Sequence, residues 1–211
     1  TDHLAVAQAQ VKEIYYLDGI DAGSTEVNYT GTYGATRSLV HSFALAAHAM
    51  RKRLHMPLDA AIDVLVPDTL VPLIRVDMVN DLNLGLNFLN EDPETVARAL
   101  FSALRLNVTW YYDYSADVGA RGAMQIAQAA GTLNNFPATF RSWMFPPGTW
   151  VRLDGGTLDV GMIRDSSLVE TNDYRIFAEE WVQVCKRGGE SIALDVTVCP
   201  NGTAPTPVSA F

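Results

Sequence analysis

The stretch Leu153–Glu180, LDGGTLDVGMIRDSSLVETNDYRIFAEE, decides how the last third of this chain folds. A glycine-rich loop that binds phosphate is followed by a lysine with serine or threonine, and by a helix whose N-terminus faces the anion. The DGG at 154–156 has neither feature. Instead, Leu158, Val160 and Met162 fall on alternate positions, which predicts a strand. The sequence therefore predicts that DGG is a hairpin turn between two strands.

Four strand-like runs make up the region around this stretch. They are rich in β-branched, aliphatic and aromatic residues and are separated by turn residues, as is typical of β-structure. The runs are TWVRLD (149–154), TLDVGMIRD (157–165), YRIFAEEWVQVCKR (174–187) and SIALDVTVCP (191–200). Residues 201–211 are predicted to form a flexible tail.

Helical periodicity dominates the start of the chain. Residues 1–16 have apolar side chains at helical spacing and predict the end of a helix, whereas 17–34, rich in Gly, Asp, Ser and Thr, predict a loop with one short extended piece. An amphipathic helix is predicted over 36–54, with Thr36 as its N-cap. The basic run 51–53 suits its last turn, where the helix dipole favours cations.

Strands and helices then alternate. A strand is predicted over 60–67, and a helix over 69–80 is capped by Asp68. A further helix begins at Asp92 and Pro93 and is followed by a strand over 107–114, whereas 115–149 give no clear pattern. Helices and strands mixed through the first two thirds, then strands alone, predict an α+β fold.

Composition restricts the class of protein. The 211 residues are 48% hydrophobic and 18% charged, which is typical of a globular chain with a core of its own. The net charge of −9 disfavours binding to nucleic acid unless basic residues cluster on one face. There is no apolar run of about eighteen residues, so no membrane span is predicted. Two cysteines fourteen apart predict buried free thiols in a reducing setting.

Candidate metal and catalytic residues are few. His41, His48 and His55 are spaced by seven, which separates neighbours by about 10 Å along a helix and prevents them from sharing one metal ion. Asp18 and Asp21 resemble the start of an oxygen-ligand loop, but the later acidic positions are absent, so a self-bonded loop is predicted. Because nucleophile and nucleotide motifs are also absent, no catalytic, cofactor-binding or metal-ligating residue is predicted.

Charges of both signs alternate along the late strands. Acidic residues stand at Asp165, Glu170, Asp173, Glu179 and Glu180, and basic ones at Arg164, Arg175, Lys186 and Arg187. Such a pattern is consistent with a solvated face, with a subunit interface in which charge fixes partner and register, or with an acid–base pair across a cleft. The sequence favours the first two.

Two segments resemble a known family. FPPGTWVRLDGGTLDVGMIRDSSLVETNDYRIFAEEW (145–181), followed by SIALDVTVCPNGT, resembles the C-terminal region of major capsid proteins of tailed bacteriophages that infect actinobacteria. These proteins share the fold named after the Hong Kong coliphage. LDGIDAGSTEVNYTGTYGATRSLVHSFALAAH (17–48) resembles the segment leading into the first helix of their axial (A) domain. The resemblance covers roughly two thirds of the chain and leaves 82–135 unaligned.

The resemblance implies a division of the chain. Residues 1–16 would be the end of the spine helix, 17–156 the A-domain, with a mixed sheet flanked by helices, and 157–200 strands that return to the peripheral (P) domain. The tail would be 201–211. The N-terminal arm, extended loop and most of the spine helix of the family have no counterpart here, and the chain begins at Thr1, so we expect a fragment.

The implied function is structural. Copies of the chain would form pentamers and hexamers that tile an icosahedral shell around packaged phage DNA, with a scaffold and a maturation protease as further partners. The protein would reside in the virion and assemble in the host bacterial cytoplasm. No catalysis, cofactor, metal, membrane contact or sequence-specific nucleic-acid binding is implied, and no lysine–asparagine pair for a cross-link is found.

The residues expected at subunit contacts combine apolar anchors with charges. The anchors lie in RSWMFPPGTW (141–150), beside a Pro-Pro kink, and the charged residues lie along the late strands. The full set is Trp143, Phe145, Arg164, Asp165, Glu170, Asp173 and Arg175.

Two alternatives remain open at this point. An encapsulin-like cellular shell protein would share the fold and enclose enzymes as cargo. An α/β enzyme domain with its site in 82–135 would instead need a pocket with convergent polar groups.

Overall fold

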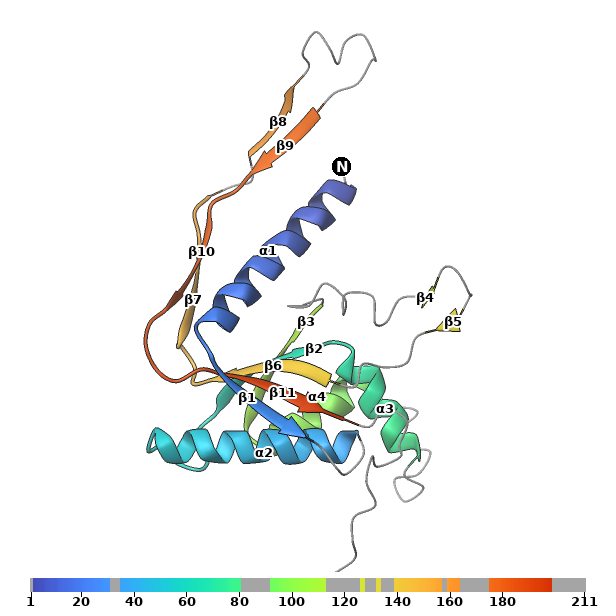
Figure 1. Cartoon of the computed structure of the whole chain (residues 1–211), viewed down its shortest axis with the longest axis vertical. Helices are drawn as coiled ribbons and strands as arrows, with labels where there is room; N and C mark the ends of the chain where they lie inside the picture. Colours follow the sequence, from blue (N-terminus) through green and yellow to red (C-terminus); the bar gives the residue numbers. More distant parts are fainter. Residues whose placement is uncertain are drawn as a thin grey trace, which may run out of the picture.

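A five-stranded mixed sheet organises the chain (Figure 1). The computed structural model describes residues 2–30, 35–80, 92–112, 126–127, 132–133, 139–156, 159–163 and 175–198. The strand order is β1-β11-β6-β2-β3, with bounds Thr25–Thr30, Ile192–Thr197, Thr139–Phe145, Ile62–Pro67 and Leu106–Tyr111. β1 is parallel to β11 and β2 to β3, whereas β6 is antiparallel to both of its neighbours.

Helices lie on both sides of this sheet. Helix α2 (Thr36–Arg53) and α4 (Pro93–Ala103) lie below it in Figure 1, and α3 (Leu70–Asn80) lies at one end. Helix α1 (Asp2–Ala22) rises from the opposite side. The described part is therefore a mixed α+β fold with a mixed sheet flanked by helices, as the sequence predicts.

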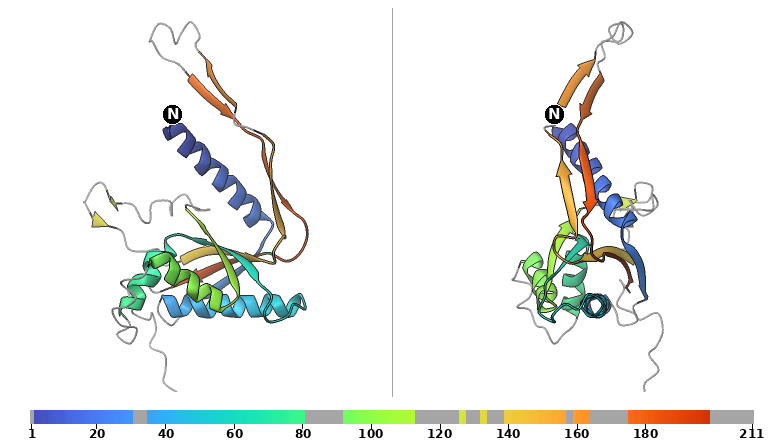
Figure 2. Two further views of the ribbon diagram at one scale, coloured as in Figure 1. Left: turned by 180° about the vertical axis from the view of Figure 1, so that it is seen from behind. Right: turned by 90° about the vertical axis from the view of Figure 1, so that its left-hand side faces the viewer.

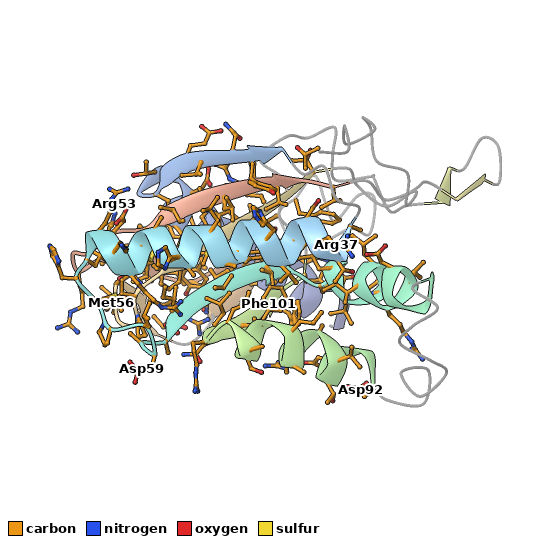
Figure 3. All side chains as sticks on the ribbon, turned by 90° about the horizontal axis from the view of Figure 1, so that it is seen from below. Arg37, Arg53, Met56, Asp59, Asp92 and Phe101 are labelled. Atoms are coloured by element: carbon orange, nitrogen blue, oxygen red, sulfur yellow. The ribbon has the colours of Figure 1, made fainter. Side chains whose placement is uncertain are left out.

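The main core fills the space between the sheet and α2, α3 and α4. Helix α2 contributes Leu39, Phe43, Ala47 and Met50, whose three- and four-residue spacing places them on one helix face. Their partners include Ile62, Val64 and Val66 of β2, Leu70, Leu73 and Ile74 of α3, and Leu194 and Val196 of β11. Phe43 meets Phe101 of α4, which is labelled in Figure 3, edge-to-face, with ring centroids 5.2 Å apart.

A long two-stranded arm projects from the sheet (Figure 2). Its lower part pairs β7 (Trp150–Asp154) with β10 (Val182–Lys186), and its upper part pairs β8 (Asp159–Ile163) with β9 (Arg175–Glu179), both antiparallel. We refer to these four strands as the β-arm. Helix α1 contacts β10 and lies alongside the lower part. A further short pair is β4 (Ile126–Ala127) with β5 (Thr132–Leu133).

Local signals placed several elements correctly. The predicted helices at 36–54, 69–80 and from Pro93 are present, and so are the strands at 60–67 and 107–114, with ends shifted by a few residues. Asp92 is the N-cap of α4 and accepts a hydrogen bond from the Thr95 amide at 3.2 Å. The basic residues of the last turn of α2 are also as predicted.

The predicted N-cap Thr36 is wrong. Ala35 occupies the cap position and provides no side-chain hydrogen bond. The Thr36 amide instead donates to the Asp77 carboxylate of α3 at 2.7 Å. A neighbouring helix therefore satisfies an amide that a local cap usually serves.

Helix α1 continues through the first part of the predicted loop 17–34, ending at Ala22. The reason is tertiary: Leu17 and Ile20 are buried in a second apolar cluster with Tyr111, Trp143 and Phe145. That burial outweighs the helix-weakening glycine at 19. The extended piece expected in this segment is β1.

The predicted hairpin turn at 154–156 is also wrong, because β7 pairs with β10 and not with β8. Residues 155–156 instead connect the two parts of one side of the β-arm. The Gly155 amide donates to the Trp181 carbonyl at 2.7 Å, and a Cβ at Gly155 would lie 2.8 Å from Cβ of Trp181. Glycine is present here because the opposite strand approaches too closely for a side chain.

The expected boundary between the A-domain and the returning strands, at residue 156, falls between strands that are hydrogen-bonded to each other. β7 precedes residue 156 but belongs to the β-arm, and β11, assigned to the returning strands, is the second strand of the main sheet. Long-range pairing, which the sequence order does not reveal, causes both differences. The predicted tail 201–211 lies outside the described residues.

Arg51 is a buried cation that joins the end of α2 to two connections, the one from α2 to β2 and the one from α4 to β3. Its Nε donates to the Ala60 carbonyl at 3.0 Å, and its Nη2 donates to the carbonyls of Leu104 and Arg105 at 3.0 and 3.2 Å. The residue is 8% exposed. Three backbone acceptors at the start of β2 and the end of α4 therefore depend on one side chain.

We expect Arg51→Met to lower the free energy of unfolding by about 3 kcal/mol, because buried carbonyls lose their donors while the apolar stem is kept. Urea unfolding followed by circular dichroism measures this. Arg53→Met is the control: its side chain is 68% exposed and pairs only with Glu190 among the described contacts, so the change should stay below about 1 kcal/mol. Equal losses in both variants would contradict the role given to Arg51.

Candidate functional site

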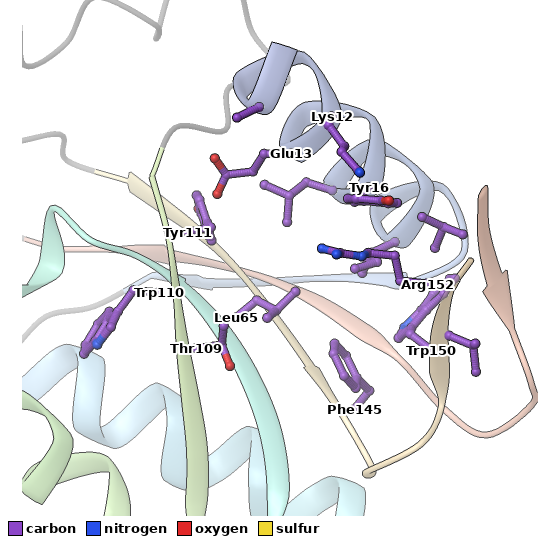
Figure 4. Close-up of a pocket in the computed structure, with 15 residues that line it drawn as sticks. Lys12, Glu13, Tyr16, Leu65, Thr109, Trp110, Tyr111, Phe145, Trp150 and Arg152 are labelled. Atoms are coloured by element: carbon purple, nitrogen blue, oxygen red, sulfur yellow. The ribbon is translucent and has the colours of Figure 1, made fainter. Parts of the chain in front are cut away.

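A cavity of about 530 Å³ lies where α1, the sheet and the β-arm meet (Figure 4). We call it the junction cavity. Its walls are largely apolar and aromatic, and its charged lining groups come from α1 and β7. The apolar lining includes Tyr16, Leu17, Ile20, Leu65, Tyr111, Phe145, Trp150 and Val184, and the charged lining consists of Lys12, Glu13 and Arg152.

The base of α1 is attached to the sheet by one carboxylate. Oδ1 of Asp21 accepts hydrogen bonds from Nε of Arg141 at 2.9 Å and from Nε1 of Trp143 at 2.8 Å. Nη1 of Arg141 also donates to Asp195 of β11 at 2.6 Å, and the Tyr111 hydroxyl of β3 donates to the Arg141 carbonyl at 2.6 Å. This cluster joins α1 to β3, β6 and β11, and we call it the Asp21 cluster.

The protonation states in the Asp21 cluster fit an ion pair. Burial raises the pKa of Asp195, and the Arg141 guanidinium opposes that rise. Burial also acts to lower the pKa of Arg141, but the hydrogen bond to Asp21 and the charge of Asp195 outweigh it, so this pKa is raised. Arg141 therefore stays charged, and its charge-assisted hydrogen bonds to Asp21 and Asp195 connect α1 to the sheet.

Side chains of α1 also hold the lower β-arm. Nζ of Lys12 donates to Asp154 of β7 at 2.9 Å and to Glu180 between β9 and β10. The hydrogen bonds to Glu180 and then to Asp154 raise the pKa of Lys12. The Arg152 guanidinium lies over the Tyr16 ring, 4.9 Å from its centroid. One helix face therefore contacts both sides of the arm.

Close backbone approach brings the arm and α1 together. A Cβ at Gly19 would lie 3.2 Å from Cβ of Val184, and one at Gly23 would lie 2.4 Å from the Trp150 ring. The Trp150 indole donates to Ser191 Oγ at 3.1 Å, and Lys186 donates to the Gly23 carbonyl at 2.7 Å. The glycines of the predicted 17–34 loop serve as packing positions at this contact.

The outer face of the lower β-arm is apolar and open. Residues that contact α1 (Arg152, Asp154 and Val184) alternate with Leu153, which is 47% exposed. Trp181, opposite Gly155, is 74% exposed. The face toward α1 thus mixes charged side chains with Val184, and the outer face carries two large exposed apolar side chains beside the exposed Gln183.

The expected apolar anchors lie in the interior. Trp143 is completely buried and Phe145 is 7% exposed, and both pack in the cluster under α1. Both lie in the second half of β6, where α1 covers them, so they do not form an open contact surface of this chain. The exposed apolar residues of the neighbouring arm, Leu153 and Trp181, were not singled out from the sequence.

The expected charged contact residues are placed only in part. Arg164, Asp165, Glu170 and Asp173 lie outside the described residues, and Arg175 begins β9, where only its backbone is described. Their role in subunit contacts stays a prediction. The part of the alternative enzyme site that is described includes Thr109, Trp110 and Tyr111, which line the junction cavity from β3.

The residues considered for metal binding do not converge. Asp18 and Asp21 lie on α1 and not on a loop, and His41 shares a hydrogen bond with the Tyr29 hydroxyl at 2.8 Å. No group of three metal-ligating side chains occurs among the described residues. Among the described helices there is none whose length and hydropathy would suit a membrane span.

The cluster residues Asp21, Arg141 and Asp195 were not predicted to act together. They are separated by 120 and 54 positions in the sequence. The one local signal is the arginine next to the aromatic and apolar residues of β6, since a charge in a largely buried strand needs a partner. Comparisons with protein-family models, curated proteins and solved structures give no match.

Lys12 predicts a pH dependence of the contact between α1 and the β-arm. Because its pKa is raised in the folded state, its pairing is fully present below the unfolded value of about 10.4 and is lost as pH rises through the folded pKa. We expect amide exchange in β7 and β10, corrected for the intrinsic pH effect, to increase in that alkaline range. Lys12→Met should remove this step. A step of the same size in the variant would contradict the assignment to Lys12.

Proposed function

We propose that this chain is the axial-domain-containing portion of a tailed-phage major capsid protein, which tiles an icosahedral shell around packaged phage DNA. Its partners would be further copies of itself in pentamers and hexamers, with a scaffold and a maturation protease during assembly in the bacterial host. It would reside in the virion and catalyse no reaction. The resemblance of 17–48 and 145–181 to that family supports the proposal.

The β-arm is the observation that carries this proposal. Isolated two-stranded ladders are marginally stable in water, and their unpaired edges invite contact with other chains. The lower ladder is covered on one face by α1, but the upper ladder β8–β9 extends past the N-terminus of α1 (Figures 1 and 2). A shell in which neighbouring subunits cover each arm explains an element that a free monomer would stabilise poorly.

Exposed apolar residues near the arm support the same proposal. Leu153 and Trp181 lie on its outer face, and Val11 and Tyr15, one helical turn apart on α1, are 63% and 48% exposed. Contacts with other subunits would bury these side chains of the arm and of the helix beside it. Aromatic residues such as Trp181 are enriched at the centres of interfaces.

The first test is electron microscopy of the product of the complete natural reading frame, expressed alone. We expect closed shells of uniform size. Phage DNA as content would support the capsid, whereas enzymes as content would favour the encapsulin-like alternative. Particles of single-subunit size, both alone and with the scaffold encoded beside it, would overturn the proposal.

We expect Trp181→Ser combined with Leu153→Ser to reduce the yield of closed shells at least about tenfold, because apolar side chains at an interface centre each contribute more than about 1 kcal/mol. Negative-stain microscopy measures the yield. Leu45→Ser combined with Leu58→Ser is the matched control, since these leucines are 55% and 74% exposed on α2 and the loop after it. If both double variants lose shells equally, the arm has no special role.

The charge pairing predicted for Arg164 and Asp165 has its own test. We expect charge reversal at Arg164 or at Asp165 to impair shell assembly while the circular dichroism spectrum stays unchanged, because like charges across a contact suppress docking. Restored assembly in the double reversal would support pairing between these charges across the contact. Normal shells from both single variants would remove these residues from the proposed interface.

A further inference from the structure

The junction cavity has the properties of a small-molecule site. Its volume of about 530 Å³ lies within the range of about 300–1,000 Å³ found for ligand pockets. Its walls are mainly aliphatic and aromatic, and few polar groups enter it. The residues used below are Tyr16, Tyr111, Trp150 and Arg152 (Figure 4).

One polar group in this lining has no partner. The Tyr16 hydroxyl is buried and makes no hydrogen bond among the described residues, and Tyr16 as a whole is 9% exposed. A buried hydroxyl without a partner is costly, so native structures rarely retain one. Because this hydroxyl oxygen has almost no accessible surface, a ligand in the cavity would contact the ring of Tyr16 and not its oxygen.

The charged lining groups differ in how far they are already paired. Lys12 is paired with Asp154 and Glu180, and the Glu13 carboxylate accepts a hydrogen bond of 2.9 Å from the Tyr112 amide. Arg152 lies over the Tyr16 ring and has a long ionic contact of 3.8 Å with Asp154, whose carboxylate already accepts a hydrogen bond from Lys12 at 2.9 Å. Its side chain is 63% exposed, and in Figure 4 its guanidinium extends toward the space between Glu13 and Phe145.

We propose that the junction cavity binds a small organic carboxylate with an aromatic or aliphatic body. The body would pack among Tyr111, Trp150 and the apolar side chains below α1. The carboxylate would accept hydrogen bonds from Arg152, whose planar fork matches carboxylate geometry. This site does not depend on the proposed shell function, since every residue in it comes from one chain.

Three probes with one body and different head groups test the proposal: 2-naphthoate, 2-naphthylmethanol and 2-naphthylmethylammonium. Calorimetric titration should show 2-naphthoate binding on the order of tenfold more tightly than the alcohol, because a charge-assisted hydrogen bond is about twice as strong as a neutral one. The ammonium should bind most weakly, since it faces Arg152.

Variants then assign the interaction to its residues. Arg152→Gln should remove the preference for the carboxylate over the alcohol while leaving the affinity for the alcohol unchanged. Arg187→Gln is the matched control, because Arg187 is exposed on the same hairpin but does not line the cavity. It should leave all three affinities unchanged.

Several results would overturn the proposal. One is no binding of 2-naphthoate at millimolar concentration, and another is equal affinity for the three probes. A third is a carboxylate preference that Arg152→Gln leaves intact. Light scattering provides a further outcome: self-association abolished by Arg152→Gln, without probe binding, would assign the cavity to a second copy of the chain.

Discussion

The carboxylate of Asp21 is the interaction on which the rest of this architecture depends. It accepts both the indole N–H of the fully buried Trp143 and the guanidinium of Arg141. An indole N–H without a partner in this position would be costly, and so would an arginine in the middle of the sheet. One side chain at the end of α1 satisfies both, and in doing so it fixes where the helix leaves the sheet.

The position of α1 determines the two features that bear on function. The base of the helix is fixed at the Asp21 cluster, and Lys12 reaches the β-arm about two and a half turns away. Between these attachments, α1 rises from the sheet, so that side chains do not fill the space beneath it. The junction cavity is that space. The same attachment supports the lower β-arm. Such support matters because an isolated two-stranded ladder is only marginally stable in water.

The sequence predicted the elements whose signals are local. The cap at Asp92 with Pro93 and the apolar spacing of α2 depend on residues a few positions apart. It failed where distant residues decide. The glycines at 19 and 23 suggested a loop. Glycine occupies these positions because Val184 and Trp150 pack too closely for a larger side chain. Strand β6 was not predicted, since its burial on both faces removes the alternation that marks a strand.

The candidate sites also depend on contacts between residues that are distant in the sequence. Leu153 and Trp181 stood within predicted strands, and only the pairing of β7 with β10 shows that they face away from α1. The cavity could not be predicted, because its lining comes from α1, β2, β3, β6, β7 and β10. Trp143 and Phe145 had the composition of an interface, yet the same composition serves a core, and the covering helix decides between the two.

The alternation of β7 links the two proposals physically. Arg152 and Asp154 point toward α1, whereas Leu153 between them points outward. Adjacent residues of one strand therefore line the cavity side and the open face, and the backbone that positions one positions the other. A neighbouring subunit that covers Leu153 would restrict the motion of Arg152 at the same time. Carboxylate binding and subunit contact should then influence each other through a single strand, with reciprocal effects on the two affinities.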